Sequence, residues 1–207
     1  DVTTEVYPYT AASTSLESAI FDDGWQEKLG ISYSDLQWET TGERLTKESF
    51  DKYRKQGGVV IIHMMKPEWI KVGIQHPNTS IGSDGMPYAP KAHPRTAGTF
   101  SRVLGKYVRE EKVISLMEGL RKMTIMPAQR LESIAPSVRL KGRIQVGCDA
   151  DITIFNPNTI IDKADFTGLK FSEGIQHVLV NGEFVVKNGE TVKNAFPGRP
   201  VVSKYRK

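Results

Sequence analysis

The chain has 207 residues, of which 39% are hydrophobic and 25% charged, and its formal net charge at pH 7 is +4. This balance is typical of a globular protein and excludes a largely disordered one. The basic residues are mixed with acids except in the tail 203–207, so the basic stripe expected of a nucleic-acid-binding protein is absent. No apolar run approaches the length of a membrane span.

A single cysteine, Cys148, excludes an internal disulfide. It favours a reducing compartment such as the cytoplasm but leaves the localisation open. We interpret Cys148 as a structural thiol in a turn between strands. The chain opens directly on a strand-like segment without a signal peptide, so we expect that the true beginning lies elsewhere.

The first forty residues contain one clear strand signal. Alternating, β-branched residues predict a strand over 2–7, which Pro8 ends. The small polar stretch 9–15 is expected to end in a helical segment. The stretch 21–38 is irregular and is expected to be a long loop with one short helical turn.

The next elements alternate between helix and strand. Thr46 is placed to cap a helix that a glycine pair ends near residue 57. The apolar run 59–62 is typical of a strand buried on both faces. Pro67 should begin the next helix, and 79–82 should form the next strand. This βα repetition predicts a parallel sheet.

Helices and then short strands follow. Apolar faces and a capping pattern predict helices over 100–110, from Ser115 to about residue 123, and over 127–131. Further strands are predicted over 142–147, 151–155, 176–180 and 183–186, the last two joined by the hairpin signal Asn181-Gly182.

The fold class predicted from these elements is α/β, with a partial βα layer over 1–140 and a small antiparallel β unit over 141–207. Three βα strands cannot close an eight-stranded barrel. Either they form a small open sheet, or residues outside this chain supply the missing strands.

Asp84 follows a short apolar segment, and glycine comes directly after it. A barrel strand ends in this way when its last side chain must point into a site. An ordinary Asp-Gly turn explains the same residues equally well.

Several motifs carry a family resemblance that runs in order through the chain. They are DVTTEVYPYT at 1–10, IGSDG at 81–85, HPR at 93–95 with GTFSRVL at 98–104, RKMT at 121–124, GCDAD at 147–151, VLVNG at 178–182 and PGR at 197–199. Together they resemble the amidohydrolase superfamily and, within it, the N-acyl-D-amino-acid deacylases, or D-aminoacylases. One departure is the stretch 132–138, which is longer than the family's usual link into its β domain.

The resemblance implies a metal-dependent (β/α)₈ (TIM) barrel with a small antiparallel β-sandwich. This chain would hold the last three βα units over 1–140 and the C-terminal part of the sandwich over 141–207. The family's zinc ligands would lie upstream, leaving Asp84 as the one residue here that could contact the metal. The chain would be the C-terminal half of a hydrolase for N-acyl-D-amino acids. It would be inactive alone and completed by the N-terminal half of the barrel or by self-association.

The resemblance also implies roles for five residues. Asp84 resembles the aspartate that takes a proton from metal-bound water and passes it to the leaving amine. Arg95 resembles the arginine that binds the substrate's α-carboxylate, although a surface ion pair is the plain alternative. Tyr7 could donate to the developing oxyanion and Ser13 could help to hold the carboxylate; a core aromatic and a loop residue are the alternatives. His63 closes a strand and is expected beside the site, touching substrate rather than metal.

The other histidines are interpreted as structural: His76 and His177 as surface or packing residues, and His93 as a residue that shapes its loop. Two other functions stay open. One is a related cyclic-amide hydrolase of the dihydroorotase or hydantoinase type, against which the YPY and HPR motifs argue. The other is a catalytically inactive fragment or self-associating remnant.

Overall fold

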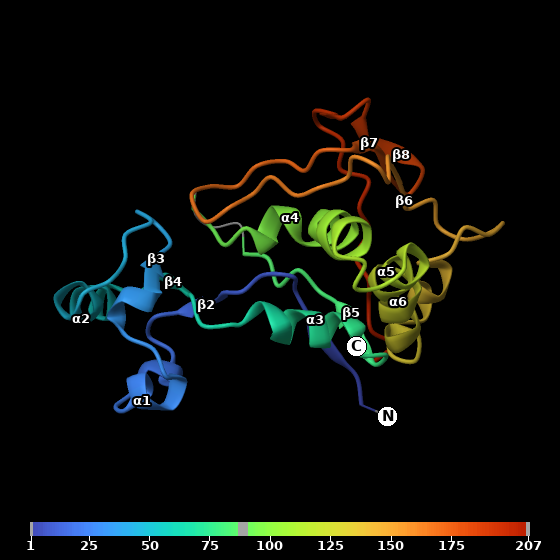
Figure 1. Cartoon of the computed structure of the whole chain (residues 1–207). Helices are drawn as coiled ribbons and strands as arrows, with labels where there is room; N and C mark the ends of the chain where they lie inside the picture. The colour runs from blue at the N-terminus through green and yellow to red at the C-terminus, as the bar shows by residue number, and fades with distance from the viewer. Residues whose placement is uncertain (1, 87–90, 206–207) are drawn as a thin grey trace.

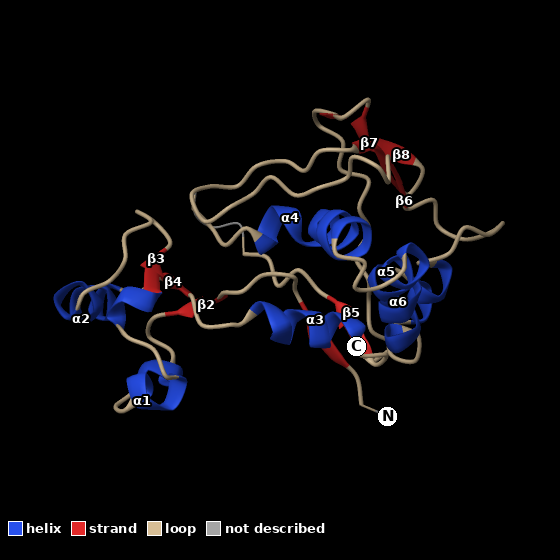
Figure 2. Ribbon diagram, viewed as in Figure 1, coloured by secondary structure: helices blue, strands red, loops and turns tan. Residues whose placement is uncertain are grey.

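The structure, a computed structural model of the whole chain, describes residues 2–86 and 91–205. Asp1 of the first motif and the last two residues of the basic tail therefore lie outside the described residues. The described strands form three separate sheets of two, three and four strands (Figures 1 and 2). None of the described helices is long and apolar enough to cross a membrane.

The two-stranded sheet is the parallel pair that the βα pattern predicted. Strand β1 (Thr4–Val6) pairs in parallel with β5 (Thr79–Ile81). Helix α3 (Pro67–Gln75) precedes β5 and begins with its proline in the first turn, where the missing N–H costs nothing. It buries Ile70 and Ile74 in the core beside this sheet. Because the strands are parallel, their carboxyl ends open on the same side.

The three-stranded sheet differs from the prediction. Strands β2 (Ala12–Ser15), β4 (Val59–Ile62) and β3 (Leu36–Trp38) lie in the order β2-β4-β3, and both pairings are antiparallel. The expected helical end of 9–15 is therefore wrong, and β4 does not continue the parallel sheet. An apolar run such as β4 indicates burial, but it does not specify the direction of the neighbouring strands.

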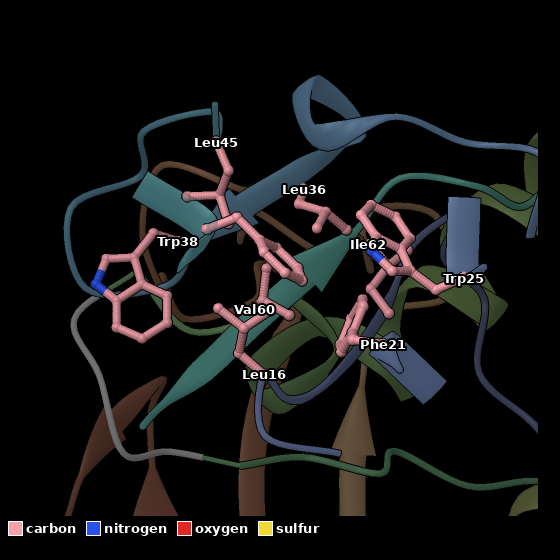
Figure 3. Packing of buried hydrophobic residues seen from close by; sticks show 9 residues of the cluster. Leu16, Phe21, Trp25, Leu36, Trp38, Leu45, Val60 and Ile62 are labelled. Atoms are coloured by element: carbon pink, nitrogen blue, oxygen red, sulfur yellow. The ribbon is translucent and has the colours of Figure 1, made fainter. Parts of the chain in front are cut away.

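This antiparallel sheet has a core of its own, closed by α1 (Trp25–Leu29) and α2 (Lys47–Gln56). The Thr46 hydroxyl accepts the Ser49 N–H at 3.3 Å, which confirms the predicted cap of α2. The expected loop 21–38 contains the short helical turn, as α1, but also the fully buried β3. Figure 3 shows the side chains of this core, which are Leu16, Phe21, Trp25, Leu36, Trp38, Leu45, Phe50, Val60 and Ile62.

The central helices follow the predicted order. Helix α4 (Arg95–Arg102) starts earlier than expected and continues as the π-helical η3 (Val103–Glu110). The Ser115 side chain caps α5 (Leu116–Met123), and α6 (Ile125–Leu131) follows. Short 3₁₀ turns lie at Ala19–Phe21, Tyr33–Asp35 and Pro136–Leu140.

Lys122 joins α5 to the parallel strands. Its side chain is fully buried, and its ammonium donates to the Thr79 carbonyl at 2.8 Å and to the His76 carbonyl. Backbone carbonyls at the start of β5 therefore receive a charged donor, and burial lowers the pKa of Lys122. This contact fixes the end of β5 opposite the one that leads to Asp84.

The last part of the chain forms one antiparallel sheet. It contains β6 (Ile152–Phe155), β7 (Ile175–Val180), β8 (Glu183–Lys187) and β9 (Glu190–Thr191) in sequence order. Figure 2 shows it beyond α4, with the long connection between β6 and β7 running back past that helix. Since the described residues of this region hold a single sheet, its place in a sandwich stays a prediction.

The stretch 142–147 was expected to be a strand and is not one. Gly142 and Gly147 both have positive φ, and Ile144 and Val146 are more than nine-tenths exposed. An alternating sequence forms a stable strand only where a partner strand pairs with it and one of its faces is covered. Within the described residues this stretch has neither.

The β7–β8 hairpin gives a stability prediction. Asn181 and Gly182 have φ values of 48° and 83°, as the Asn-Gly signal predicted. A Cβ added at Gly182 would meet only the Ala150 Cβ, at 3.9 Å, so the cost of Gly182→Ala is conformational. We expect it to lower the free energy of unfolding by about 1 kcal/mol. Asn188→Gly, at another positive φ of 55° in the turn after β8, is the control and should change it by much less; equal effects in urea unfolding would contradict this account.

Candidate functional site

The site lies where the parallel strands β1 and β5 end. Tyr7 follows β1 directly, and Asp84 comes three residues after β5. Asp84 has a φ of 48°, in the left-handed region, and its side chain is 64% exposed. Because parallel strands end at the same edge, these two residues come together from distant parts of the sequence.

Arg95 is the centre of the site. It is only 2% exposed, yet its Nη2 lies 2.9 Å from the Asp84 Oδ2 and 3.3 Å from the Ser13 carbonyl oxygen. Its guanidinium carbon lies over the Tyr7 ring, 4.6 Å from the centroid. Arg95 is therefore not a surface residue, although it does pair with a nearby acid. Four of the five predicted site residues meet at this one guanidinium.

The Tyr7 hydroxyl is held in its protonated form. Burial raises its pKa above the usual value of 10, and the nearby Arg95 charge only partly opposes this. A protonated phenol can donate a hydrogen bond, which is what oxyanion stabilisation requires. The stacked guanidinium also limits how far the ring can turn.

His93 shapes the turn that carries Arg95. Its Nδ1 accepts the Arg95 backbone N–H at 3.1 Å, and its Nε2 lies 2.9 Å from the Ala11 carbonyl oxygen. These partners assign the neutral tautomer with the proton on Nε2. The ring packs edge-on against Tyr7 and Tyr9. The contacts agree with the structural role expected for His93.

Ser13 and His63 surround the site less directly. The Ser13 carbonyl, not its hydroxyl, meets Arg95, and the buried hydroxyl has no partner within the described residues. The His63 Nε2 lies 3.0 Å from the Gln37 Oε1, and its ring packs against Phe166. Phe166 also packs against His93, so His63 lies one side chain away from the residues around Arg95.

Three further residues, Gln37, Glu39 and Phe166, stand in none of the sequence motifs. Gln37 donates to the Phe166 backbone carbonyl at 2.8 Å, which holds the long β6–β7 connection against β3. Glu39 is a buried acid at the end of β3. Gln37 falls within the stretch 21–38, which the sequence predicts to be a long loop. The sequence offers one sign, because Leu36 and Trp38 alternate with polar residues as in a strand.

The buried histidines give a prediction for pH. Burial lowers the pKa of His93 to about 3 and that of His63 to about 4, below the ordinary 6.5. As the pH falls, these histidines are protonated in the unfolded chain at a higher pH than in the folded chain. Their contribution to the free energy of unfolding is therefore fully present above pH 6.5 and is lost as the pH drops toward 4. We expect a loss of about 1.4 kcal/mol per pH unit from His93 alone. Urea unfolding at pH 7 and pH 5 measures it.

A matched variant tests the origin of this pH dependence. His63→Gln removes one of the two groups, so the fall in unfolding free energy between pH 7 and pH 5 should become smaller. An unfolding free energy that is flat over this range in the unsubstituted protein would contradict the prediction.

A metal centre does not fit the described residues by themselves. No group of three His, Cys, Asp or Glu side chains within 2–86 and 91–205 could hold an ion. The Asp84 carboxylate is engaged by Arg95 instead. What the site offers is a carboxylate that can accept a proton and a buried cation that can bind an anion.

Comparison with known proteins gives the site its context. A model described as "Amidohydrolase family" matches residues 70–186, which include Asp84 and Arg95. The chain belongs to the amidohydrolase family. Two curated relatives from Alcaligenes xylosoxydans xylosoxydans, an N-acyl-D-glutamate deacylase and a D-aminoacylase, are each 34% identical over 88% of this chain and 38% of their own length.

A solved structure agrees with the family assignment. The N-acyl-D-glutamate deacylase of Bordetella bronchiseptica, complexed with zinc and a phosphonate mimic of the tetrahedral intermediate, superposes with a TM-score of 0.79 at 31% identity. The superposition covers 97% of this chain and 42% of that one. The resemblance to D-aminoacylases drawn from the motifs is confirmed, and this chain spans about two fifths of the length of these relatives.

Proposed function

We propose that this chain is the part of an N-acyl-D-amino-acid deacylase that binds the substrate's α-carboxylate and carries the proton-transfer group. The observation that supports it is the pair of Asp84 and the buried Arg95, 2.9 Å apart at the ends of β1 and β5. The family membership and the deacylase relatives favour amide hydrolysis as the reaction.

Arg95 has the geometry of an anion receptor. It already binds one carboxylate, that of Asp84, through Nη2, and a guanidinium can hold a carboxylate through two parallel N–H donors. A substrate carboxylate can therefore take the place that Asp84 occupies. Asp84, being mostly exposed, is then free to turn toward the scissile amide.

Asp84 and Tyr7 would share the chemistry. Asp84 takes a proton from the attacking water and returns it to the leaving amine. The Tyr7 hydroxyl donates to the oxygen on which negative charge develops, because its raised pKa keeps it protonated. Ser13 and His63 line the approach, with Ser13 nearer to the carboxylate.

The rest of the active site would come from residues outside this chain. Zinc is present in the Bordetella relative, and ligands for such an ion would have to be supplied by the upstream half of the barrel or by another copy. Two features favour such a partner. The β1–β5 pair is bounded by no further strand among the described residues, and α3 exposes Trp69 and Val72 to 54% and 65%.

The test is made on the protein as isolated from its source. Denaturing mass spectrometry gives its polypeptides, and the release of free amino acid from N-acetyl-D- and N-acetyl-L-amino acids gives its activity. We expect a longer chain or a second polypeptide together with D-selective hydrolysis. A lone 207-residue chain without hydrolysis would favour an inactive remnant, and hydrolysis of cyclic amides alone would favour the hydantoinase type.

A further inference from the structure

Asp162 is a buried acid for which the proposed function has no role. It lies on the long β6–β7 connection, and its side chain is only 5% exposed. The neighbouring Ile161 exchanges two backbone hydrogen bonds with Glu173, at 3.2 and 3.0 Å, so the connection holds Asp162 in a defined place. A carboxylate buried to this extent is costly unless donors or cations compensate for it.

Two donors from distant parts of the chain compensate Asp162. The Tyr9 hydroxyl donates to the Asp162 Oδ2 at 2.9 Å, and the Arg102 Nη1 lies 3.0 Å from the same oxygen. Burial and the neighbouring carboxylate raise the pKa of Tyr9 above its usual value, so the phenol keeps the proton that it donates. Because Arg102 is the last residue of α4, the acid joins the connection both to that helix and to the segment after β1.

Arg102 extends this network to the residue that follows Tyr7. Its Nε donates to the Pro8 carbonyl at 2.8 Å, and its guanidinium carbon lies 4.7 Å from the centroid of the Tyr9 ring. The hydroxyl of the buried Tyr107 lies 3.5 Å from the same Pro8 carbonyl oxygen. The two residues after Tyr7 are therefore held, Pro8 by its backbone carbonyl and Tyr9 by its hydroxyl and its ring.

Tyr7 stands between this network and the parallel sheet. On one side of it, the Val6 carbonyl accepts the Gly82 N–H at 3.1 Å. On the other side, the ring of Pro8 fixes φ, and a residue before proline is confined to extended backbone. Since Arg102 also holds the Pro8 carbonyl, the backbone is fixed on both sides of Tyr7. The direction in which the Tyr7 ring leaves the chain is fixed with it.

We propose that Asp162 is a positioning residue which, through Tyr9 and Arg102, holds Tyr7 so that its hydroxyl meets the oxygen on which negative charge develops. The inference rests on the proposed function. Stability alone explains the network less well, because a buried ion pair often stabilises a protein no more than apolar side chains of the same volume would. What the polar groups add is a fixed geometry for the segment that carries Tyr7.

The test is steady-state hydrolysis of an N-acetyl-D-amino acid by the active protein that contains this chain. Asp162→Ala should lower kcat about 10- to 10²-fold and keep KM within about 3-fold, because a displaced oxyanion donor weakens binding of the transition state more than binding of the substrate. Asp162→Asn keeps an oxygen that accepts the Tyr9 hydroxyl and should recover most of kcat. Glu173→Ala is the control on the same connection. Its carboxylate pairs with Lys163 at the surface, and its removal should change neither quantity.

A second background separates positioning from general damage. Tyr7→Phe removes the hydroxyl that Asp162 is proposed to position, so adding Asp162→Ala to it should lower kcat by less than about 3-fold. If Asp162→Ala folds poorly by circular dichroism, Gly98→Ala replaces it in both backgrounds. A Cβ at Gly98 would collide with the Tyr9 hydroxyl and lie 2.8 Å from the Asp162 Cβ, so it displaces Tyr9 without removing a polar group.

Equal fractional losses of kcat with and without the Tyr7 hydroxyl would overturn the inference, because they indicate general damage rather than a displaced Tyr7. An unchanged kcat in Asp162→Ala, or an asparagine variant as impaired as the alanine variant, would also overturn it. A Tyr7→Phe protein with full kcat, or an unsubstituted protein that hydrolyses no N-acyl-D-amino acid, is a different result. It removes the role proposed for Tyr7 or the proposed function itself, and this inference with it.

Discussion

Replacing Asp84 by asparagine in the active protein should lower kcat by about 10³-fold and change KM much less. General acid–base groups contribute about 10²- to 10⁴-fold, and an amide cannot accept the proton that the carboxylate takes. The substitution suits the backbone, because asparagine tolerates the φ of 48° at this position as well as aspartate does. The measurement is steady-state hydrolysis of an N-acetyl-D-amino acid.

A control separates the loss of a base from the loss of a surface charge. Asp23→Asn removes an exposed carboxylate in a different part of the chain and should leave kcat unchanged. A D84N protein that keeps kcat within about fivefold of the unsubstituted enzyme would mean that Asp84 is only the turn residue that its Asp-Gly sequence equally allowed.

The sequence predicted individual elements better than the sheets they join. Local signals located β1, β5, α2 and α3, since caps, prolines and apolar runs act within a few residues. The pairing of β4 depends on β2 and β3, which are distant in the chain and whose residues lack a strong strand signal. The alternating stretch 142–147 shows the converse, a strand pattern without a partner strand among the described residues.

The sequence predicted those residues of the site that stand in recognisable motifs. Asp84, Arg95 and Tyr7 stand in motifs, and the parallel pairing of β1 with β5 brings them together. Phe166 reaches the same place through tertiary packing of a long connection that no local pattern describes. Its ring packs against His93 because Gln37, on the antiparallel sheet, holds its backbone carbonyl.

Replacing Arg95 should separate activity from stability. Arg95→Met should lower kcat/KM for an N-acyl-D-amino acid by about 10²-fold, because a charged hydrogen-bonding partner of the substrate contributes about 1.5–3 kcal/mol. The free energy of unfolding should stay the same or rise. Arg95 is 2% exposed, whereas its partner Asp84 is 64% exposed. The ion pair therefore offsets only a small part of the free energy that burial of the Arg95 charge costs.

A structural arginine would behave in the opposite way. If Arg95 served mainly to hold Tyr7 and Ser13 in place, Arg95→Met would lower the free energy of unfolding by several kcal/mol, as removal of one partner of a buried pair does. Its activity would then fall in proportion to the folded fraction. Arg95→Lys refines the comparison, since it keeps the charge but loses the two parallel donors, and it should recover only part of the substrate binding. Arg44→Lys, at an exposed position, is the matched control and should alter neither kcat/KM nor the free energy of unfolding. A stable Arg95→Met protein that binds the acid substrate weakly would identify Arg95 as a residue that serves substrate binding rather than stability.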